Sequence, residues 1–542
     1  MSNLVSIMHN CLIKTLWRIL YPLVRPLASD SILRDVLEDL FNSVCKIFHN
    51  VLKSEADPEA LALLLLLIPV CASATFSLRT ERFGMAKRSM LMSEYDIKLP
   101  PEFMTYFYTQ TLDHFSYKPY GNTSTFQQRY IMNSKYWGGA NTSSPIFVYT
   151  GDEASLTGVA AYSGFIVDLA SRFNGLLLYI EHRYYGDSVP FGSKEEAFQS
   201  TERLGFFSST QALADYAQLI TDLKKNTSAE NCPVIALGGS YGGMLASWFR
   251  LKYPHITIGA LASSAPILYF DDITPQNAFH VTATKDFRDT SESCYNTIRQ
   301  SWSEIDKVAA EPNGLQNLSG IFSNCRPINS SENLKIYLEA LYLYSAQYDN
   351  PPDNLKVNKL CSAIDGAAEG TDILHRIAAA HNVSVGLPCN LLIDYKPNNN
   401  SEWRWQTCTE MVMPIGYGAN ETMFQERPFN LNNLTNTCQD LFHVTPRPHW
   451  ITTEFGGHNI SSVLKNFASN IIFSNGLRDP YSAGGVLENI SSTIVAVYTD
   501  KGAHTLDLAT PTPNDPDWLT TQRDTEIKII ESWIAEYNAR LA

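Results

Sequence analysis

Short apolar runs alternate with amphipathic stretches along residues 100–268. Apolar runs that end in turn-forming residues are typical of strands buried on both faces of a parallel sheet. Stretches with apolar residues at three- and four-residue spacing, such as residues 211–224, indicate helices between these strands. The alternation predicts an α/β fold, in which helices cover both faces of a mostly parallel sheet. The strands are predicted at residues 128–131, 146–149, 176–180, 234–237 and 259–262.

The pattern changes between residues 269 and 468, where helical stretches, Asn- and Pro-rich loops and six cysteines replace the alternation. Further strands are predicted at residues 471–474 and 493–498, and a final amphipathic helix at 520–539. We therefore expect one domain in two parts, residues 100–268 and 469–542. Residues 269–468 are expected to be a mainly helical cap insertion over the carboxyl edge of the sheet, where parallel α/β folds place their sites.

One predicted strand leads into Gly238-Gly239-Ser240-Tyr241-Gly242, and a helical segment follows. The pattern G-x-S-x-G between a strand and a helix is typical of the nucleophile elbow of α/β-hydrolases. In such a turn Ser240 has strained backbone angles, and Gly238 and Gly242 leave space that a Cβ atom would fill. N–H groups at the start of the helix face the charge that develops on a reacting carbonyl oxygen. Ser240 is therefore the candidate nucleophile.

A serine hydroxyl needs a base, and the base needs a carboxylate that orients it. In α/β-hydrolases the acid and then the histidine follow the serine along the chain. Asp479 and His504 each follow one of the two last predicted strands. Asp507 is a rival acid, but it lies too close to His504 in sequence to approach the imidazole from a separate strand. His182 precedes Ser240, so we expect it to be structural.

Backbone N–H groups are the candidates for an oxyanion hole. The residue after the nucleophile, Tyr241, supplies one of them in this kind of site. A second donor comes from the loop after an earlier strand, which here carries Gly151 and Asp152. An ordinary turn between a strand and a helix is the alternative for that loop.

Several segments together resemble serine peptidases of family S28, carboxypeptidases and dipeptidyl peptidases that cut after proline. The resemblance covers roughly residues 100 to 540. It implies an α/β-hydrolase fold with a helical cap and a triad of Ser240, Asp479 and His504. It also implies an exopeptidase that releases the C-terminal residue after a penultimate proline through an acyl-enzyme. A dipeptidyl peptidase II-like aminopeptidase, cutting after proline or alanine at position two, is the alternative. The matching segments are Thr111-Leu112-Asp113-His114-Phe115, residues 181–188, 238–246, 252–255, 263–266 and 473–480, and Gly502-Ala503-His504.

The resemblance further implies a proline-binding wall at Met244, Met413 and Tyr481. The family often has Trp at the last of these positions, so an altered preference is expected rather than a loss of binding. A family disulfide is absent, because the matching places lie near Gln276 and Gly416 and neither residue is cysteine.

The six cysteines after the nucleophile indicate a disulfide framework in an oxidising compartment, and spacing alone allows 15 connectivities. The family pattern implies Cys294 with Cys361, Cys325 with Cys389, and Cys408 with Cys438. Cys232 is expected to remain a buried thiol. Neither a C-x-x-C pair nor a metal-ligand cluster is present in the sequence, so we expect no metal and no cofactor.

Secretory signals agree with this compartment. Residues 59–74 contain an apolar run followed by Ala72-Ser73-Ala74, which resembles a signal peptide and its cleavage site. The run is too short for a stable membrane span. Residues 1–58 are interpreted as an upstream extension of unknown role, with a targeting leader as the alternative. The expected location is the secretory pathway, and then the lysosome or vacuole or the outside of the cell. The sequence carries 11 candidate glycosylation sites: Asn122, Asn141, Asn226, Asn317, Asn329, Asn382, Asn399, Asn420, Asn433, Asn459 and Asn489.

The formal charge of −14 argues against a nucleic-acid partner, because proteins that bind nucleic acids usually carry a basic face. Peptides with proline beside the cleaved bond are the expected substrates. The sequence leaves the oligomeric state open, a homodimer included. A non-catalytic lumenal binding glycoprotein is the hypothesis from another functional class.

Overall fold

The computed structural model describes residues 97–541, except residues 118, 119, 122, 326, 353, 386–401 and 419. The segments predicted at residues 1–58 and 59–74 therefore lie outside the described residues. Among the helices that are described, none is long and apolar enough to cross a membrane.

Eight strands form one sheet: β1 (Met104–Thr111), β2 (Thr125–Asn133), β3 (Ile146–Thr150), β4 (Leu176–Ile180), β5 (Val234–Gly239), β6 (Gly259–Ser263), β7 (Ile471–Gly476) and β8 (Ile494–Thr499). Their order in the sheet is β1-β2-β4-β3-β5-β6-β7-β8. β2 runs antiparallel to both of its neighbours, and the remaining pairs are parallel. The mostly parallel sheet confirms the predicted fold class.

Every predicted strand is present, but the sequence did not predict β1. This strand lies at the edge of the sheet and exposes apolar side chains, among them Met104 and Phe107, which are 52% and 54% exposed. It lacks the continuous apolar run by which the buried strands were identified, because most of its side chains are exposed or only half-buried.

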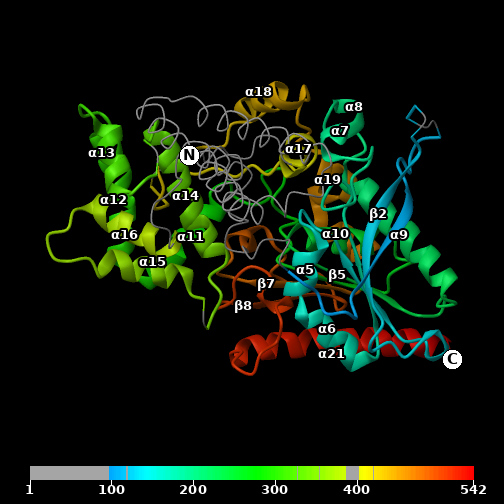
Figure 1. Ribbon diagram of the computed structural model, residues 1–542. Coiled ribbons are helices and arrows are strands. Elements are labelled where there is room, and N and C mark those ends of the chain that lie inside the picture. Colours follow the sequence, from blue (N-terminus) through cyan, green and yellow to red (C-terminus); the bar gives the residue numbers. More distant parts are fainter. Residues whose placement is uncertain are drawn as a thin grey trace, which may run out of the picture. The chain divides into compact units, whose positions relative to one another are not determined.

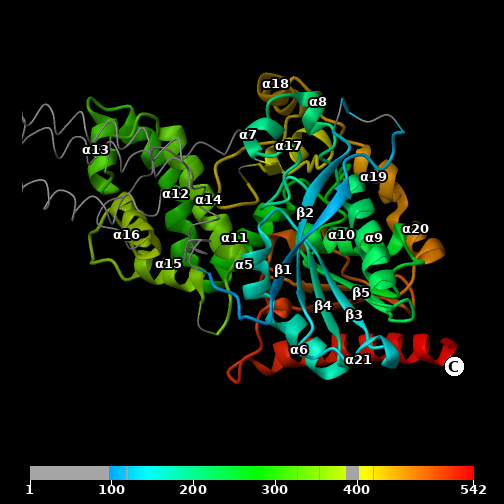
Figure 2. The same cartoon turned by 45° about the vertical axis from the view of Figure 1, so that its right-hand side comes forward.

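Two hydrophobic cores cover the two faces of the sheet. Alternate residues of β3, for example, point into different cores: Ile146 and Val148 into one, Phe147 and Tyr149 into the other. Helices α9 (Ser209–Asn226) and α10 (Tyr241–Lys252) pack into the first core. Helices α6 (Gly164–Phe173) and α21 (Asp517–Leu541) pack into the second and lie side by side along one face of the sheet (Figures 1 and 2).

The predicted insertion contains parts that pack differently. A separate core joins α11 (Ala278–Thr290), α12 (Glu292–Ala309), α13 (Gly314–Ile321), α14 (Ser331–Gln347), α15 (Lys356–Asp365) and α16 (Ile373–Val385). In contrast, α19 (Trp450–Phe455) and α20 (Ile460–Phe467) contribute apolar side chains to the core around α9 and α10. The last part of the insertion is therefore packed with the sheet.

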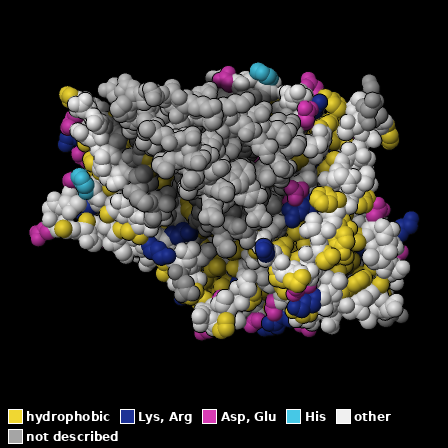
Figure 3. Space-filling model, in the orientation of Figure 1, with side chains coloured by type: hydrophobic (Ala, Val, Ile, Leu, Met, Phe, Trp, Pro, Cys, Tyr) yellow, Lys and Arg dark blue, Asp and Glu magenta, His cyan; other side chains and the backbone are white. Residues whose placement is uncertain are grey.

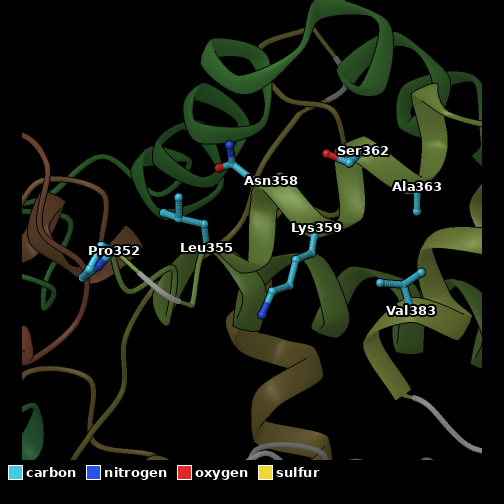
Figure 4. Close-up of a pocket in the computed structure, with 7 residues that line it drawn as sticks. All are labelled: Pro352, Leu355, Asn358, Lys359, Ser362, Ala363 and Val383. Carbon is cyan, nitrogen blue, oxygen red and sulfur yellow. The ribbon is translucent and has the colours of Figure 1, made fainter.

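A cavity of about 460 Å³ lies along α15 and α16 (Figure 4). The polar side chains of Asn358, Lys359 and Ser362 do not converge on one point there, and none of the lining residues was predicted to belong to a site. The cavity is thus separate from the residues that carry the expected chemistry.

Disulfides join Cys294 to Cys361 within the helical core, and Cys408 to Cys438 between α17 (Glu402–Thr409) and α18 (Leu431–Phe442). Both are pairings that the family resemblance implies. The pairing of Cys325 with Cys389 is not tested, because Cys389 lies outside the described residues. Cys232 is a buried free thiol, as predicted.

A backbone hydrogen bond lies at the place of the missing family disulfide. The N–H of Gly416 donates to the carbonyl oxygen of Gln276 at 3.0 Å. The two segments that the resemblance would join by a disulfide are therefore adjacent through a hydrogen bond.

The surface is compatible with glycosylation and has mixed charge. Asn122 and Asn399 lie outside the described residues, and the other candidate asparagines have exposed side chains: Asn141, Asn226, Asn317, Asn329, Asn382, Asn420, Asn433, Asn459 and Asn489. Figure 3 shows basic and acidic side chains interspersed over the described part of one face.

Candidate active site

Ser240 lies in a sharp turn between β5 and α10. Its φ of 57° and ψ of −125° are strained for a residue with a side chain, and cost about 1–3 kcal/mol. The glycines around it have no room for a Cβ atom. A Cβ on Gly238 would lie 2.1 Å from the Gly242 carbonyl oxygen, and one on Gly242 would lie 2.7 Å from the Thr150 carbonyl oxygen. These contacts explain the glycine spacing that identified the elbow.

Asp479 and His504 meet at the carboxyl edge of the sheet, because β7 and β8 are parallel neighbours and each residue follows one of them. His504 Nδ1 lies 2.6 Å from Asp479 Oδ2, and the two side chains are 2% and 0% exposed. The other oxygen of Asp479 accepts the N–H of Tyr481 at 3.0 Å. The rival acid, Asp507, instead accepts the hydroxyl of Ser263.

The backbone holds the Ser240 and His504 loops to the end of β6. Ser240 N–H donates to Ser263 O at 2.9 Å. Thr505 N–H, directly after the histidine, donates to Ser264 Oγ at 2.9 Å. No hydrogen bond joins the Ser240 hydroxyl to His504 among the described residues. Hydrogen bonds between a nucleophile and its base are commonly long before substrate binds. The three residues lie at the same edge of the sheet, and of the two hydrogen bonds expected among them only the one between Asp479 and His504 is formed.

Nearby acids favour the charged form of the imidazole. Burial by itself lowers the pKa of His504, but the charge and hydrogen bond of Asp479 outweigh it, so the pKa is raised above its usual value. Glu153 and Asp507 act in the same direction. The site is therefore suited to hold a proton on this imidazole during a reaction.

One predicted oxyanion donor is wrong. The N–H of Gly151 donates to Ile180 O at 3.0 Å, so the sheet already uses it. The N–H of Tyr241 is at the first position of α10, where a helix provides no acceptor, and it faces none among the described residues. Asp152 lies beside the elbow, where its side chain would be 3.4 Å from a Cβ on Gly242. Tyr241 and Asp152 remain the candidate donors.

Two neighbouring carboxyl groups, those of Asp152 and Glu153, lie in the loop after β3 and interact with the charge of His504. Asp152 accepts the hydroxyl of Tyr149 at 2.9 Å. Burial raises the pKa of Asp152 to about 6, despite that hydrogen bond. The neighbouring charge of Asp152 also raises the pKa of Glu153, but the Glu153 side chain is exposed and solvent screens this effect. Asp152 can therefore change charge near neutral pH, next to His504.

Aromatic side chains surround the imidazole. The ring centroids of Tyr481 and Tyr348 each lie 5.7 Å from that of His504. Phe279 packs edge-on against Tyr481, with the ring centroids 4.7 Å apart. Sequence analysis named Tyr481 but missed Tyr348 and Phe279, which belong to the helical insertion and have no motif around them.

The two methionines of the predicted wall pack with the core of the sheet. Met244 follows Ser240 by one helical turn and is 1% exposed, within the core of the sheet. Met413 is partly buried against the same core. Tyr481 is the predicted wall residue for which a contact with His504 is seen among the described residues.

The helical insertion also contacts the loops that carry Asp479 and His504. The backbone N–H of His504 donates to Gln347 O, at the end of α14, at 3.0 Å. Arg478, which precedes Asp479, forms an ion pair with the buried Asp349. The position of the acid and base loops therefore depends on the insertion as well as on the sheet.

The segment around His182 is structural, as predicted. His182 is fully buried, its Nε2 lies 3.0 Å from the Tyr241 hydroxyl, and burial lowers its pKa to about 4. Arg183 forms two short hydrogen bonds with the buried Asp215, at 2.7 and 2.6 Å. These contacts hold the segment after β4 against the start of α10, through Tyr241, and against α9, through Asp215.

Comparison with known proteins gives consistent matches. A family model described as Serine carboxypeptidase S28 matches residues 110–526. Lysosomal Pro-X carboxypeptidase of Homo sapiens is 36% identical over 498 residues, which is 88% of this chain and 98% of the relative. Prolyl carboxy peptidase like protein 5 of Caenorhabditis elegans is 32% identical over 77% of this chain and 87% of its own length. Among solved structures, an acetylester hydrolase from Corynebacterium glutamicum is similar with a TM-score of 0.35 and 12% identity, covering 79% of this chain and 95% of that chain. That last likeness is too weak to support an argument.

Proposed function

The chain belongs to the serine carboxypeptidase S28 family and is a serine-type peptidase, and on that premise we propose that it releases the C-terminal residue of peptides after a penultimate proline. The observation that carries the proposal is the buried 2.6 Å contact between His504 and Asp479, beside a strained Ser240. A serine hydroxyl by itself is a weak nucleophile at neutral pH, and it needs an adjacent base to attack a carbonyl carbon. His504, oriented by Asp479, is suited to be that base.

In the proposed mechanism, His504 Nε2 takes the proton from Ser240 Oγ as the oxygen attacks the carbonyl carbon of the prolyl residue. Asp479 holds the imidazole by Nδ1 and stabilises the positive charge that the ring then carries. The N–H of Tyr241, with that of Asp152 as the second candidate, faces the oxygen that becomes negative. His504 gives its proton to the leaving amine, and water cleaves the acyl-enzyme by the same steps.

Proline preference is proposed for the aromatic group beside His504. The Tyr481 ring is held between Phe279 and the imidazole, so it presents a fixed apolar surface close to the reacting bond. A flat pyrrolidine ring packs well on such a surface. The similarity to relatives named Pro-X carboxypeptidase supports the same preference.

Blocked peptides provide the test. The substrate is a short peptide with a penultimate proline, offered in one form with a protected N-terminus and in another with an amidated C-terminus. We expect cleavage of the first form only. Cleavage of only those peptides with a free N-terminus would replace the proposal with the dipeptidyl peptidase alternative.

Ser240→Ala is the matched control, since it removes one oxygen atom and leaves the elbow intact. It should lose activity by several orders of magnitude and should not react with a fluorophosphonate probe. A wild-type protein that also fails to react with the probe would support the non-catalytic binding glycoprotein instead.

We also propose a lysosomal or other secretory-pathway location, which the disulfides and the name of the human relative support. Glycosidase-sensitive migration of the purified protein would test passage through that pathway. A homodimer stays a prediction, which light scattering of the purified protein would test.

A further inference from the structure

One buried glutamine of the helical insertion bonds to the residue that follows Ser240. Gln406 lies in α17 and its side chain has no exposed surface. Its Nε2 donates to the hydroxyl oxygen of Tyr241 at 2.8 Å, and its Oε1 accepts the hydroxyl of Tyr185 at 2.6 Å. Tyr241 is the first residue of α10 and is 1% exposed. The insertion is therefore bonded to the nucleophile elbow inside the protein, away from solvent.

The orientation of the Gln406 amide is fixed by a second partner. Its Nε2 also lies 3.2 Å from Glu410 Oε1, one turn further along α17. Glu410 accepts the backbone N–H and the hydroxyl of Ser209, both at 2.8 Å, at the start of α9. Because a carboxylate only accepts hydrogen bonds, the nitrogen side of the amide must face Glu410, and the oxygen side then faces Tyr185. All polar atoms of this side chain are thus bonded in one arrangement.

His182 bonds the Tyr241 hydroxyl from the other side and sets the direction of the hydrogen bonds. Its Nδ1 lies 2.7 Å from the Arg183 carbonyl oxygen, which can only accept, so Nδ1 carries a proton. Burial lowers the pKa of His182 to about 4, so at neutral pH the ring is uncharged and Nε2 is an acceptor. The Tyr241 hydroxyl, 3.0 Å from Nε2, therefore donates to His182 and accepts from Gln406.

We propose that Gln406 is a positioning residue for the oxyanion hole, acting through the hydroxyl of Tyr241. The N–H of Tyr241 belongs to the peptide group that joins Ser240 to α10, so a rotation of this residue moves the donor relative to the oxyanion. Hydrogen bonds from Gln406 and to His182 hold the far end of the Tyr241 side chain, and its ring packs against Trp403 with the centroids 5.4 Å apart. A strained turn persists only where its surroundings fix it, and here α17 provides part of those surroundings.

The inference rests on the proposed function in one respect, the roles of Ser240 as nucleophile and of Tyr241 as oxyanion donor. It adds that α17 takes part in stabilising the transition state. The helix is itself well anchored. The indole N–H of Trp405 donates to the Phe207 carbonyl oxygen at 3.0 Å, and the disulfide to α18 lies two residues beyond Gln406. A rigid helix can hold the tyrosine in one position.

Gln406→Met tests the proposal, because it keeps the length of the side chain and removes its bonds to both tyrosines. On an N-protected peptide with a penultimate proline, kcat should fall by about 10-fold or more and KM should change little, since the oxyanion forms only in the transition state. Removing an oxyanion donor outright costs about 10²–10³-fold, so the loss should not exceed that range. Gln439→Met makes the same change at an exposed position of α18 and should follow the wild type.

A double variant separates this role from a general structural one. Tyr241→Phe removes the hydroxyl and should lower kcat as Gln406→Met does. Once the hydroxyl is absent, Gln406→Met should add little, because nothing remains through which Gln406 can act. A glutamine that only stabilised α17 would give losses that multiply in the double variant.

Gln406→Glu should recover activity as the pH falls. A protonated carboxyl group can accept from Tyr185 and donate to Tyr241, whereas an ionised one cannot donate. The titratable groups around these contacts are Glu410 on α17, His182 and Tyr185 after β4, and Tyr241 on α10, and Gln406→Met keeps all of them. We therefore expect the ratio of kcat in Gln406→Glu to kcat in Gln406→Met to rise from about pH 8 to about pH 5.

Reaction with a fluorophosphonate gives a readout that does not depend on peptide specificity. The phosphoryl oxygen enters the oxyanion hole when Ser240 attacks phosphorus, so the rate constant of labelling should fall in Gln406→Met as kcat does. Unfolding midpoints would show that each variant is folded at the assay temperature. A wild type that is labelled but does not cleave the peptide would contradict only the proposed substrate, and the labelling rates would still decide the role of Gln406.

Three results would overturn the inference. They are equal labelling rates in wild type and Gln406→Met, losses that multiply in the double variant, and a ratio of Gln406→Glu to Gln406→Met that does not change with pH. If Gln406→Met does not fold, the labelling rate of Gln406→Glu relative to the wild type replaces that ratio, and a pH-independent value would overturn the inference in the same way.

Discussion

Replacing Asp479 with Asn removes one charge from the site and leaves its shape almost unchanged. The carboxylate lies 2.6 Å from His504 Nδ1, and the two side chains are 2% and 0% exposed, so water screens their attraction little. At an effective dielectric constant of about 20, unit charges about 4 Å apart attract by about 4 kcal/mol. This attraction appears only when the imidazole accepts the proton of Ser240, so its loss raises the barrier. Since each 1.36 kcal/mol is tenfold in rate, kcat should fall by about 10³-fold.

The asparagine adds a second penalty. Its amide group can donate to Nδ1, which favours the tautomer with a proton on Nε2, and that nitrogen then cannot accept the proton of Ser240. The amide oxygen can still accept the N–H of Tyr481, now bonded at 3.0 Å, so the loop should keep its fold.

The assay measures kcat and KM on an N-protected peptide with a penultimate proline, and the unfolding midpoint of each variant. Asp500→Asn is the matched control, because it makes the same change at an exposed position shortly before His504 and should keep full activity. An Asp479→Asn protein that folds normally and keeps kcat within about tenfold of the wild type would refute the assignment of Asp479.

Two further predictions concern the elbow and the pH profile. Gly238→Ala should lower the free energy of unfolding by about 1–3 kcal/mol or more, because its Cβ would overlap the Gly242 carbonyl, whereas Gly158→Ala meets nothing within 4 Å and should be neutral or stabilising. Equal denaturation midpoints for these two variants would contradict the steric argument. Glu153→Gln should move the acid limb of kcat/KM to lower pH, because the charge of Glu153 raises the pKa of His504 and catalysis needs the neutral imidazole. An unmoved limb, or a shift to higher pH, would show that Glu153 does not act on the base.

Local features were predicted well where backbone chemistry restricts the residue type. The turn at Ser240 needs glycine at positions where a Cβ atom would overlap the backbone, so the glycine spacing in the sequence is enough to predict the turn. The buried strands were identified by their apolar runs, but β1 was not, because its side chains are mostly exposed or half-buried and it carries no such run. Gly151 was wrongly predicted to donate to the oxyanion. It does lie in the loop after β3, but its N–H already donates to the carbonyl oxygen of Ile180 in β4.

The insertion illustrates a different limit. Phe279 in α11 and Tyr348, directly after α14, have no recognisable motif around them. Tyr348 contacts His504 and Phe279 contacts Tyr481 because α11 and α14 pack beside the loops after β7 and β8. Asp507 was considered only as a rival acid, and its hydrogen-bond partner, the Ser263 hydroxyl, comes from the end of β6.

The sequence alone determined which residues can perform the chemistry: a serine in a glycine-bounded turn, followed by an acid and a histidine that each end a strand. Those features depend on backbone angles and on the order of elements, which short stretches of chain encode. The tertiary structure decided which N–H groups are already bonded, which rings lie beside His504, and which carboxylate the imidazole contacts. These properties depend on distances between distant segments and on exclusion of water, and neither exists until the chain has folded.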